Sequence, residues 1–139
     1  MTEKKKVCVL VFHDELCQVF NGLMTALSLL RAGEDVTIFF GSLGINVVHK
    51  DKIKELKCIP DQPEEAGKKL MEKMEEMELP TPEDMMTMLE MEGALLLACP
   101  LNYAMFGFKD ADLLDGVAIA DPDTFYTDIM VPADQVLSF

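Results

Sequence analysis

The fold of this chain is decided by residues 7–40, whose sequence is VCVLVFHDELCQVFNGLMTALSLLRAGEDVTIFF. The stretch opens with an apolar, β-branched run over residues 7–12, which is typical of a strand covered on both faces. Apolar residues then recur at helical spacing over residues 16–30, with Asp14 as the expected N-cap. A second apolar run, 36–40, predicts another buried strand. Strand, helix and strand form one βαβ unit, which predicts a parallel sheet with a right-handed crossover.

The rest of the chain repeats this alternation. Short apolar runs predict three further strands at 93–99, 117–120 and 136–139, and helical patterns are expected at 110–114 and 123–130. The sequence therefore predicts an α/β domain of the flavodoxin-like, doubly wound kind. We expect about five parallel strands in the order 2-1-3-4-5, with helices on both faces.

Length and composition indicate one folded domain over residues 1–139, because half of the residues are apolar and 27% are charged. The apolar runs are too short to cross a bilayer, and the first six residues lead directly into a strand, so we expect a cytoplasmic protein with no membrane partner. The net charge of −13 disfavours nucleic acid. Phosphate-binding loops of the GxGxxG, GxxxxGK[ST] and flavin types are missing from the sequence, and we expect no cofactor.

Residues 51–92 differ in character and are interpreted as a helical, Met-rich insertion packed outside the minimal fold. Four prolines punctuate two amphipathic stretches, 64–78 and 83–92, whose methionines share a face. Such a face is either ordinary core or an adaptable docking surface. Between residues 64 and 92 there are ten acidic and three basic residues, a charge of −7, so a partner that docks here is expected to be basic.

Cys99 is the candidate chemical residue. The other cysteines, Cys8, Cys17 and Cys58, form no CxxC pair with it or with each other, and the first two fit as buried small side chains. Cys99 ends a predicted strand, and Pro100 after it can begin a helix. Backbone N–H groups at a helix start stabilise a thiolate, which is the reactive form of cysteine. A buried, purely structural cysteine at a strand end is the alternative.

Further candidates follow the first two strands. Residues 41–46 contain two glycines, which permit a tight turn at the sheet edge where ligands of such folds collect; a plain turn is the alternative. His13 follows the first strand and, in the expected strand order, would lie near Cys99, where an imidazolium would favour the thiolate. The alternative is a solvated loop histidine, which is the more usual role of a histidine beside an aspartate at a strand end. His49 is expected to be exposed. A metal site of His13, Cys17 and Cys99 is conceivable, but we expect none.

Two blocks resemble a known family. Residues 34–46, EDVTIFFGSLGIN, resemble the V-x-I-F-F-x-x-x-G-x-N segment of the DsrE/DsrF-like sulfur-carrier superfamily, in its larger peroxiredoxin-like DsrE branch. Residues 98–107, ACPLNYAMFG, followed by DLLDGV at 112–117, resemble the cysteine block of that branch. Together with the first βαβ unit, the likeness covers most of the chain outside residues 51–92.

The resemblance implies a homo-oligomeric, flavodoxin-like sulfur carrier or sulfurtransferase, a trimer or a higher multiple. Cys99, which matches the family cysteine, would accept sulfane sulfur or thiosulfate and pass it to a TusA-like carrier or another sulfur-relay protein. Cys99 has no second cysteine within forty residues, so no disulfide-resolving step is expected. The substrate-binding candidates around it are His13, Gly41, Ser42, Gly44, Asn46, Pro100 and Asn102. The alternative function is a non-catalytic small-ligand or protein-binding module with a structural Cys99.

Overall fold

The computed structural model describes residues 3–58 and 63–139 and contains one five-stranded sheet. The strands are β1 (Lys6–Val11), β2 (Asp35–Phe40), β3 (Leu95–Ala98), β4 (Val117–Ile119) and β5 (Gln135–Ser138). The α-helices are α1 (Leu16–Arg31), α2 (Glu64–Glu76), α3 (Pro82–Met91), α4 (Pro100–Met105) and α5 (Pro122–Thr124). Three 3-10 helices, η1 (Ser42–Val48), η2 (Lys52–Glu55) and η3 (Asp110–Asp112), and the π-helix η4 (Phe125–Met130) complete the fold.

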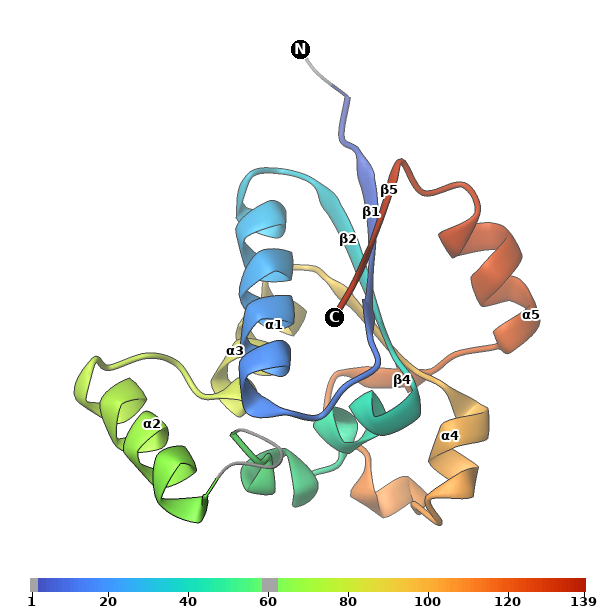
Figure 1. Cartoon of the computed structure of the whole chain (residues 1–139). Helices are drawn as coiled ribbons and strands as arrows, with labels where there is room; N and C mark the ends of the chain where they lie inside the picture. The colour runs from blue at the N-terminus through green and yellow to red at the C-terminus, as the bar shows by residue number, and fades with distance from the viewer. Residues whose placement is uncertain (1–2, 59–62) are drawn as a thin grey trace.

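The predicted fold class is confirmed. All four strand pairings are parallel. Figure 1 shows α1 and α3 on one side of the sheet and α5 on the other, which is the doubly wound, flavodoxin-like arrangement. No helix among the described residues is both long enough and apolar enough to cross a membrane.

The expected strand order is wrong. The sheet runs β4-β3-β2-β1-β5, so β2 lies between β1 and β3. The reason is that α3 packs beside α1 on the same face, and a right-handed crossover through α3 therefore adds β3 beyond β2. The chain reverses only after β4, where α5 and η4 cover the opposite face and β5 joins the free edge of β1.

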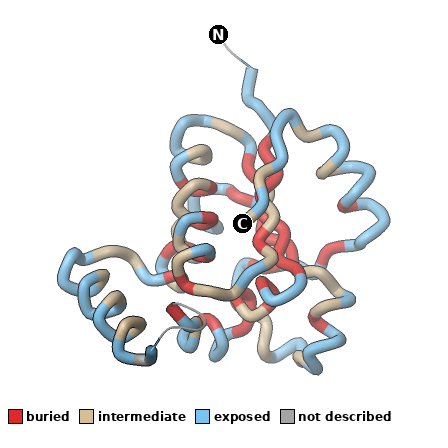
Figure 2. Tube along the Cα trace, in the orientation of Figure 1, coloured by how far each residue is buried: buried red, intermediate tan, exposed pale blue. Residues whose placement is uncertain are grey.

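Two apolar layers follow from the alternation along each strand. Val7, Val9 and Val11 of β1 enter the larger core beneath α1 and α3, whereas Cys8 and Leu10 belong to the smaller cluster on the α5 side. The buried positions in Figure 2 run along the strands between these layers. Both faces of β1 are therefore covered, which is why its sequence is apolar from Val7 to Val11.

The predicted capping role of Asp14 is also wrong. Helix α1 begins at Leu16, its N-cap is Glu15, and no side chain caps it. The carboxylate of Asp14 instead accepts a hydrogen bond of 2.9 Å from the Asn46 side-chain amide. Asp14 therefore ties the segment after β1 to η1.

The prediction that residues 64–92 pack outside the minimal fold is wrong for α3. Met85, Met86 and Leu89 are at most 1% exposed and lie in the larger core. Helix α3 supplies the crossover from β2 to β3, so it cannot be separated from the fold. None of the described side chains of α2, residues 65–76, is buried. The interpretation of residues 51–92 as an insertion stays a prediction.

Truncation of two methionines in α3 tests this difference in packing. Met85→Ala removes a fully buried side chain and is expected to lower the free energy of unfolding by about 2–5 kcal/mol. Met91→Ala, in the same helix, removes a side chain that is 77% exposed and should change it by less than about 0.5 kcal/mol. Urea unfolding followed by circular dichroism measures both values. Equal losses would contradict the placement of α3.

Candidate functional site

Cys99 lies at the corner between β3 and α4, as the sequence predicts. It is the N-cap residue of α4, and its backbone N–H donates to the Phe40 carbonyl over 2.9 Å. Its own carbonyl accepts from the Tyr103 N–H over 3.0 Å. The side chain is half-buried and packs against the smaller apolar cluster on the α5 side of the sheet. The backbone of Cys99 is therefore fixed at both ends, and the residue as a whole is only partly buried.

Ser42 and Asn102 join the loop after β2 to α4, next to this corner. The Ser42 N–H donates a 2.8 Å hydrogen bond to the Asn102 side-chain oxygen. Ser42 has a φ of +50°, a left-handed conformation that is uncommon for a residue other than glycine. The bond to Asn102 offsets the strain of this conformation. Since Asn102 stands three residues after Cys99, the structure brings Ser42, Cys99, Pro100 and Asn102 into one region.

The two glycines of residues 41–46 are explained by close packing and not by a tight turn. The segment from Ser42 onward is the 3-10 helix η1, and Gly41 is extended with φ −142°. A side chain on Gly41 would meet the rings of Phe12 and Phe39 at 3.1 and 3.2 Å. A side chain on Gly44 would collide with the Val11 carbonyl oxygen at 2.0 Å. Both glycines thus let η1 approach the ends of β1 and β2.

His13 does not share the strand junction of Cys99. It is exposed after β1, and β2 intervenes between β1 and β3. Two strand spacings, about 10 Å, separate the ends of β1 and β3. Asn46 is held by Asp14, so it belongs to the contact between η1 and the segment after β1. The expectation that His13 adjoins Cys99 came from the wrong strand order.

The other three cysteines are held in environments that disfavour the thiolate. Burial raises the pKa of Cys8 to about 11. Burial also raises the pKa values of Cys17 and Cys58, and the nearby carboxylate of Glu15 raises both further. At neutral pH these three thiols are therefore almost entirely protonated and poor nucleophiles. No group of three or more His, Cys, Asp or Glu side chains within residues 3–58 and 63–139 is arranged to hold a metal ion.

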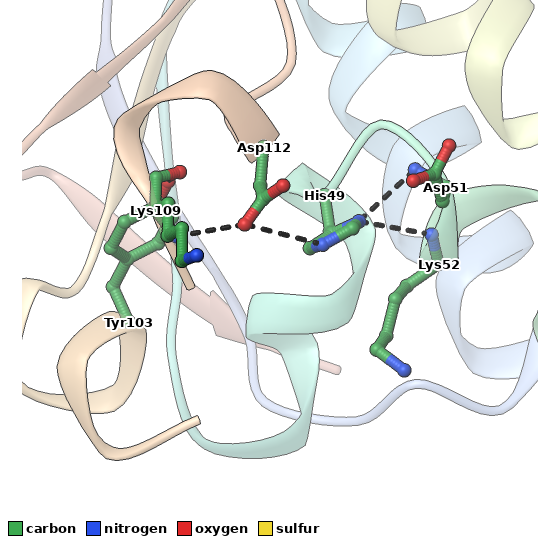
Figure 3. Close-up of polar contacts among 6 residues, drawn as sticks. All are labelled: His49, Asp51, Lys52, Tyr103, Lys109 and Asp112. Atoms are coloured by element: carbon green, nitrogen blue, oxygen red, sulfur yellow. Dashed lines mark hydrogen bonds and ion pairs between the residues drawn. The ribbon is translucent and has the colours of Figure 1, made fainter. Parts of the chain in front are cut away.

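His49 is buried, and the prediction that it is exposed is wrong. Its side chain lies edge-on to the ring of Phe108, with ring centroids 4.5 Å apart. Its Nδ1 accepts the backbone N–H groups of Asp51 and Lys52 over 3.0 and 3.2 Å. Nδ1 therefore carries no proton, and the neutral ring holds its proton on Nε2, 3.8 Å from the Asp112 carboxylate. Figure 3 shows His49 between η2 and Asp112.

Further hydrogen bonds link Asp112 to Tyr103 of α4 through the backbone of Lys109. The Asp112 carboxylate also accepts the Lys109 N–H over 2.8 Å, and the Tyr103 hydroxyl donates to the Lys109 carbonyl (Figure 3). A chain of polar contacts thus connects η2 and η3 to the helix that starts at Cys99. We read it as a positioning network for the turn after α4, which the sequence analysis did not identify.

Comparisons with known proteins agree with this architecture. The model of the DsrE/DsrF/DrsH-like family matches residues 55–136, which include α3 and Cys99. The ychN protein from E. coli has a similar structure, with a TM-score of 0.68 and 18% identity, over 96% of this chain and 99% of that one. A protein of unknown function, MTH1491 from Methanobacterium thermoautotrophicum, has a TM-score of 0.67 and 14% identity, over 98% and 100%. No curated protein matches the sequence. Because the family match covers more than half of its residues, the chain belongs to the DsrE/DsrF/DrsH-like family.

Proposed function

We propose that this protein is a sulfur carrier that accepts sulfane sulfur on Cys99 and passes it to a TusA-like partner or another sulfur-relay protein. Membership of the DsrE/DsrF/DrsH-like family indicates a role related to sulfur relay. The observation that supports Cys99 as the acceptor is its position. It is a partly exposed cysteine at the carboxyl end of a parallel strand, within the segment that the family matches.

The chemistry needs one nucleophilic sulfur. The Cys99 thiolate attacks the outer sulfur of a donor persulfide, the donor's S–S bond breaks, and the donor leaves as a thiolate that takes up a proton. With thiosulfate, the same attack releases sulfite. In each case Cys99 is left as a persulfide, and attack by the partner's thiolate on its outer sulfur regenerates the Cys99 thiolate. No net oxidation takes place, so no redox cofactor is needed.

We propose that Ser42, Pro100 and Asn102, with Gly41 behind them, form the substrate-binding surface beside Cys99. The Asn102 oxygen already accepts from Ser42, so its amide N–H₂ group is the donor left to face an anionic donor molecule. Within the part of the chain that the structure describes, that group makes a single contact, of 3.9 Å, with the Met105 sulfur. Gly44 and Asn46 contribute by setting the position of η1, whereas His13, exposed after β1, stays a predicted substrate-binding residue.

Alkylation at neutral pH distinguishes Cys99 from the other thiols. With a pKa of about 11, Cys8 holds about a hundredfold less thiolate than a thiol at the ordinary value of 9.0. We expect iodoacetamide to modify Cys99 first, at least about tenfold faster than Cys8, Cys17 or Cys58. Peptide mass spectrometry at timed intervals measures the four rates. Modification of Cys17 or Cys58 before Cys99 would count against the assignment.

We also propose that the protein is a homo-oligomer, a trimer or a multiple of one. Leu43, Leu101, Met105 and Phe106, on η1 and α4, are between 42% and 71% exposed, and such adjoining apolar residues are typical of an interface. Leu101→Glu together with Met105→Glu is expected to dissociate the oligomer because it would bury two charges there. Light scattering measures the mass, and a 15.5 kDa species for the unaltered chain would refute the proposal.

One observation favours the alternative function. Cys99 packs against the apolar cluster that contains Phe39 and Phe125, as a merely structural cysteine would. In that case the protein is a binding module, and the alkylation rates of its four thiols would follow exposure alone. The four cysteines are all free thiols, so we propose the cytoplasm, where thiols are kept reduced, as its compartment.

A further inference from the structure

A groove between α2 and the pair α1 and α3 lies outside the Cys99 site. It has a volume of about 960 Å³. Its apolar lining comes from Met24 and Leu27 of α1, Met71 and Met74 of α2, and Leu79 and Met88. Figure 1 shows α2 set apart from the sheet beyond α1 and α3.

Helix α2 has an apolar face that none of the described residues 3–58 and 63–139 fully covers. Leu70 and Met74 are only half-buried, and Met71 is 50% exposed. An amphipathic helix normally buries this face, which supplies most of its stability. Here the face looks into the groove and remains open to solvent. Methionine side chains are flexible and adapt to differently shaped partners.

The rim of the groove is acidic. Glu72, Glu75 and Glu78 stand along it. Arg31 and Lys68 also line the groove. The Arg31 guanidinium makes two 3.0 Å contacts with the Glu92 carboxylate, which compensate its charge, and the three glutamates of the rim outnumber the single Lys68. A ligand in the groove therefore meets a negative rim above an apolar floor.

The charge of the rim and the length of the groove indicate which kind of partner the groove can bind. A second copy of this chain seated in the groove with its own α2 would place acidic residues against an acidic rim, so like charges oppose that occupant at this face. The part of α2 that lines the groove, from Lys68 to Glu75, spans about 12 Å at 1.5 Å per residue. This length matches two to three turns of a partner helix with apolar anchors at positions i, i+3 or i+4, and i+7.

We propose that this groove binds a basic amphipathic helix of a partner protein. The apolar face of that helix packs on the methionine floor, and lysine or arginine side chains at its edges meet Glu72, Glu75 and Glu78. This interaction does not depend on the sulfur chemistry of Cys99, which lies at the sheet edge by α4. It would hold a partner on the protein through a surface separate from the thiol.

The test uses a fluorescein-labelled peptide of about fourteen residues that is designed as a helix, with leucines at i, i+4 and i+7 and lysines at its edges. Anisotropy with the full chain is expected to show saturable binding that weakens between low and high salt, because the charges at the rim are exposed. A peptide with glutamate in place of each lysine should bind at least about tenfold more weakly. Equal binding of both peptides, or no binding of the basic one, would overturn the proposal.

Variants of α2 locate the binding. Glu72→Lys with Glu75→Lys reverses two rim charges and should weaken binding of the basic peptide about tenfold. Glu65→Lys reverses an exposed charge of the same helix that does not line the groove, and should change binding less than about twofold. Circular dichroism checks that each variant is folded. If the Glu65→Lys variant weakened peptide binding as much as the double variant, the groove would not be the binding site. Dissociation of an oligomer by Met71→Glu would also refute the proposal, because a second copy of the chain would then cover the groove.

Discussion

Replacing Cys99 with serine is expected to abolish sulfur loading. Incubation of Cys99→Ser with a persulfide or thiosulfate donor should release no more thiol or sulfite than the donor alone, because a hydroxyl cannot form the S–S bond. The fold should be unchanged, since the hydrogen bonds that fix this residue, to Phe40 and from Tyr103, come from its backbone. Serine is also a favoured N-cap residue. Circular dichroism and the loading assay together measure this result.

Cys8→Ser is the matched control for this substitution. Its side chain is 1% exposed in the cluster on the α5 side, so a hydroxyl there is expected to cost about 1–3 kcal/mol of stability. Loading should persist at the level of the unaltered protein, because Cys8 is not the acceptor. If Cys99→Ser still loaded sulfur at that level, the carrier proposal would be wrong.

Gly44→Ala is expected to have the largest effect on stability of any single methyl addition to the described glycines. The added Cβ would lie 2.0 Å from the Val11 carbonyl oxygen and 2.7 Å from its carbon. Both atoms belong to the backbone of β1, in the middle of the sheet, so they cannot move aside as a side chain could. We expect a loss of about 3 kcal/mol or more, measured by urea unfolding.

Gly67→Ala provides the comparison. Gly67 lies in α2, and its added Cβ would only reach ordinary contact with Cys58, at 3.4 Å. Alanine favours a helix over glycine, so this substitution should leave stability unchanged or raise it by up to about 1 kcal/mol. If Gly67→Ala lowered the free energy of unfolding as much as Gly44→Ala, the collision of the added Cβ with neighbouring atoms would not be the cause. The backbone conformation of glycine would then explain the loss at both positions.

The elements of the fold could be predicted from the sequence because their signals are local. The apolar run from Val7 to Val11 indicates a strand that is buried on both faces. The helical spacing of apolar residues around Leu23 and Leu27 indicates a helix with one buried face. The strand order could not be predicted in the same way. It depends on whether α3 packs beside α1, and the amphipathic pattern of that segment does not indicate which surface it covers.

The site was predicted in part for the same reason. The corner at Cys99 follows from a strand that ends before Pro100, which is a local signal. The burial of His49 depends on Phe108 and Asp112, far along the chain, and the only nearby hint is the apolar residues just before His49. The bond between Ser42 and Asn102 likewise joins η1 to α4, which only the fold brings together.

Peptide mass spectrometry of the protein as purified, and again after incubation with a persulfide donor, tests the central claim most directly. The account predicts a mass increase of one sulfur atom on the peptide that contains Cys99, which dithiothreitol removes. The peptides that contain Cys8, Cys17 and Cys58 should stay unmodified. An added sulfur on any of those three in preference to Cys99, or none on Cys99 after incubation with the donor, would contradict it.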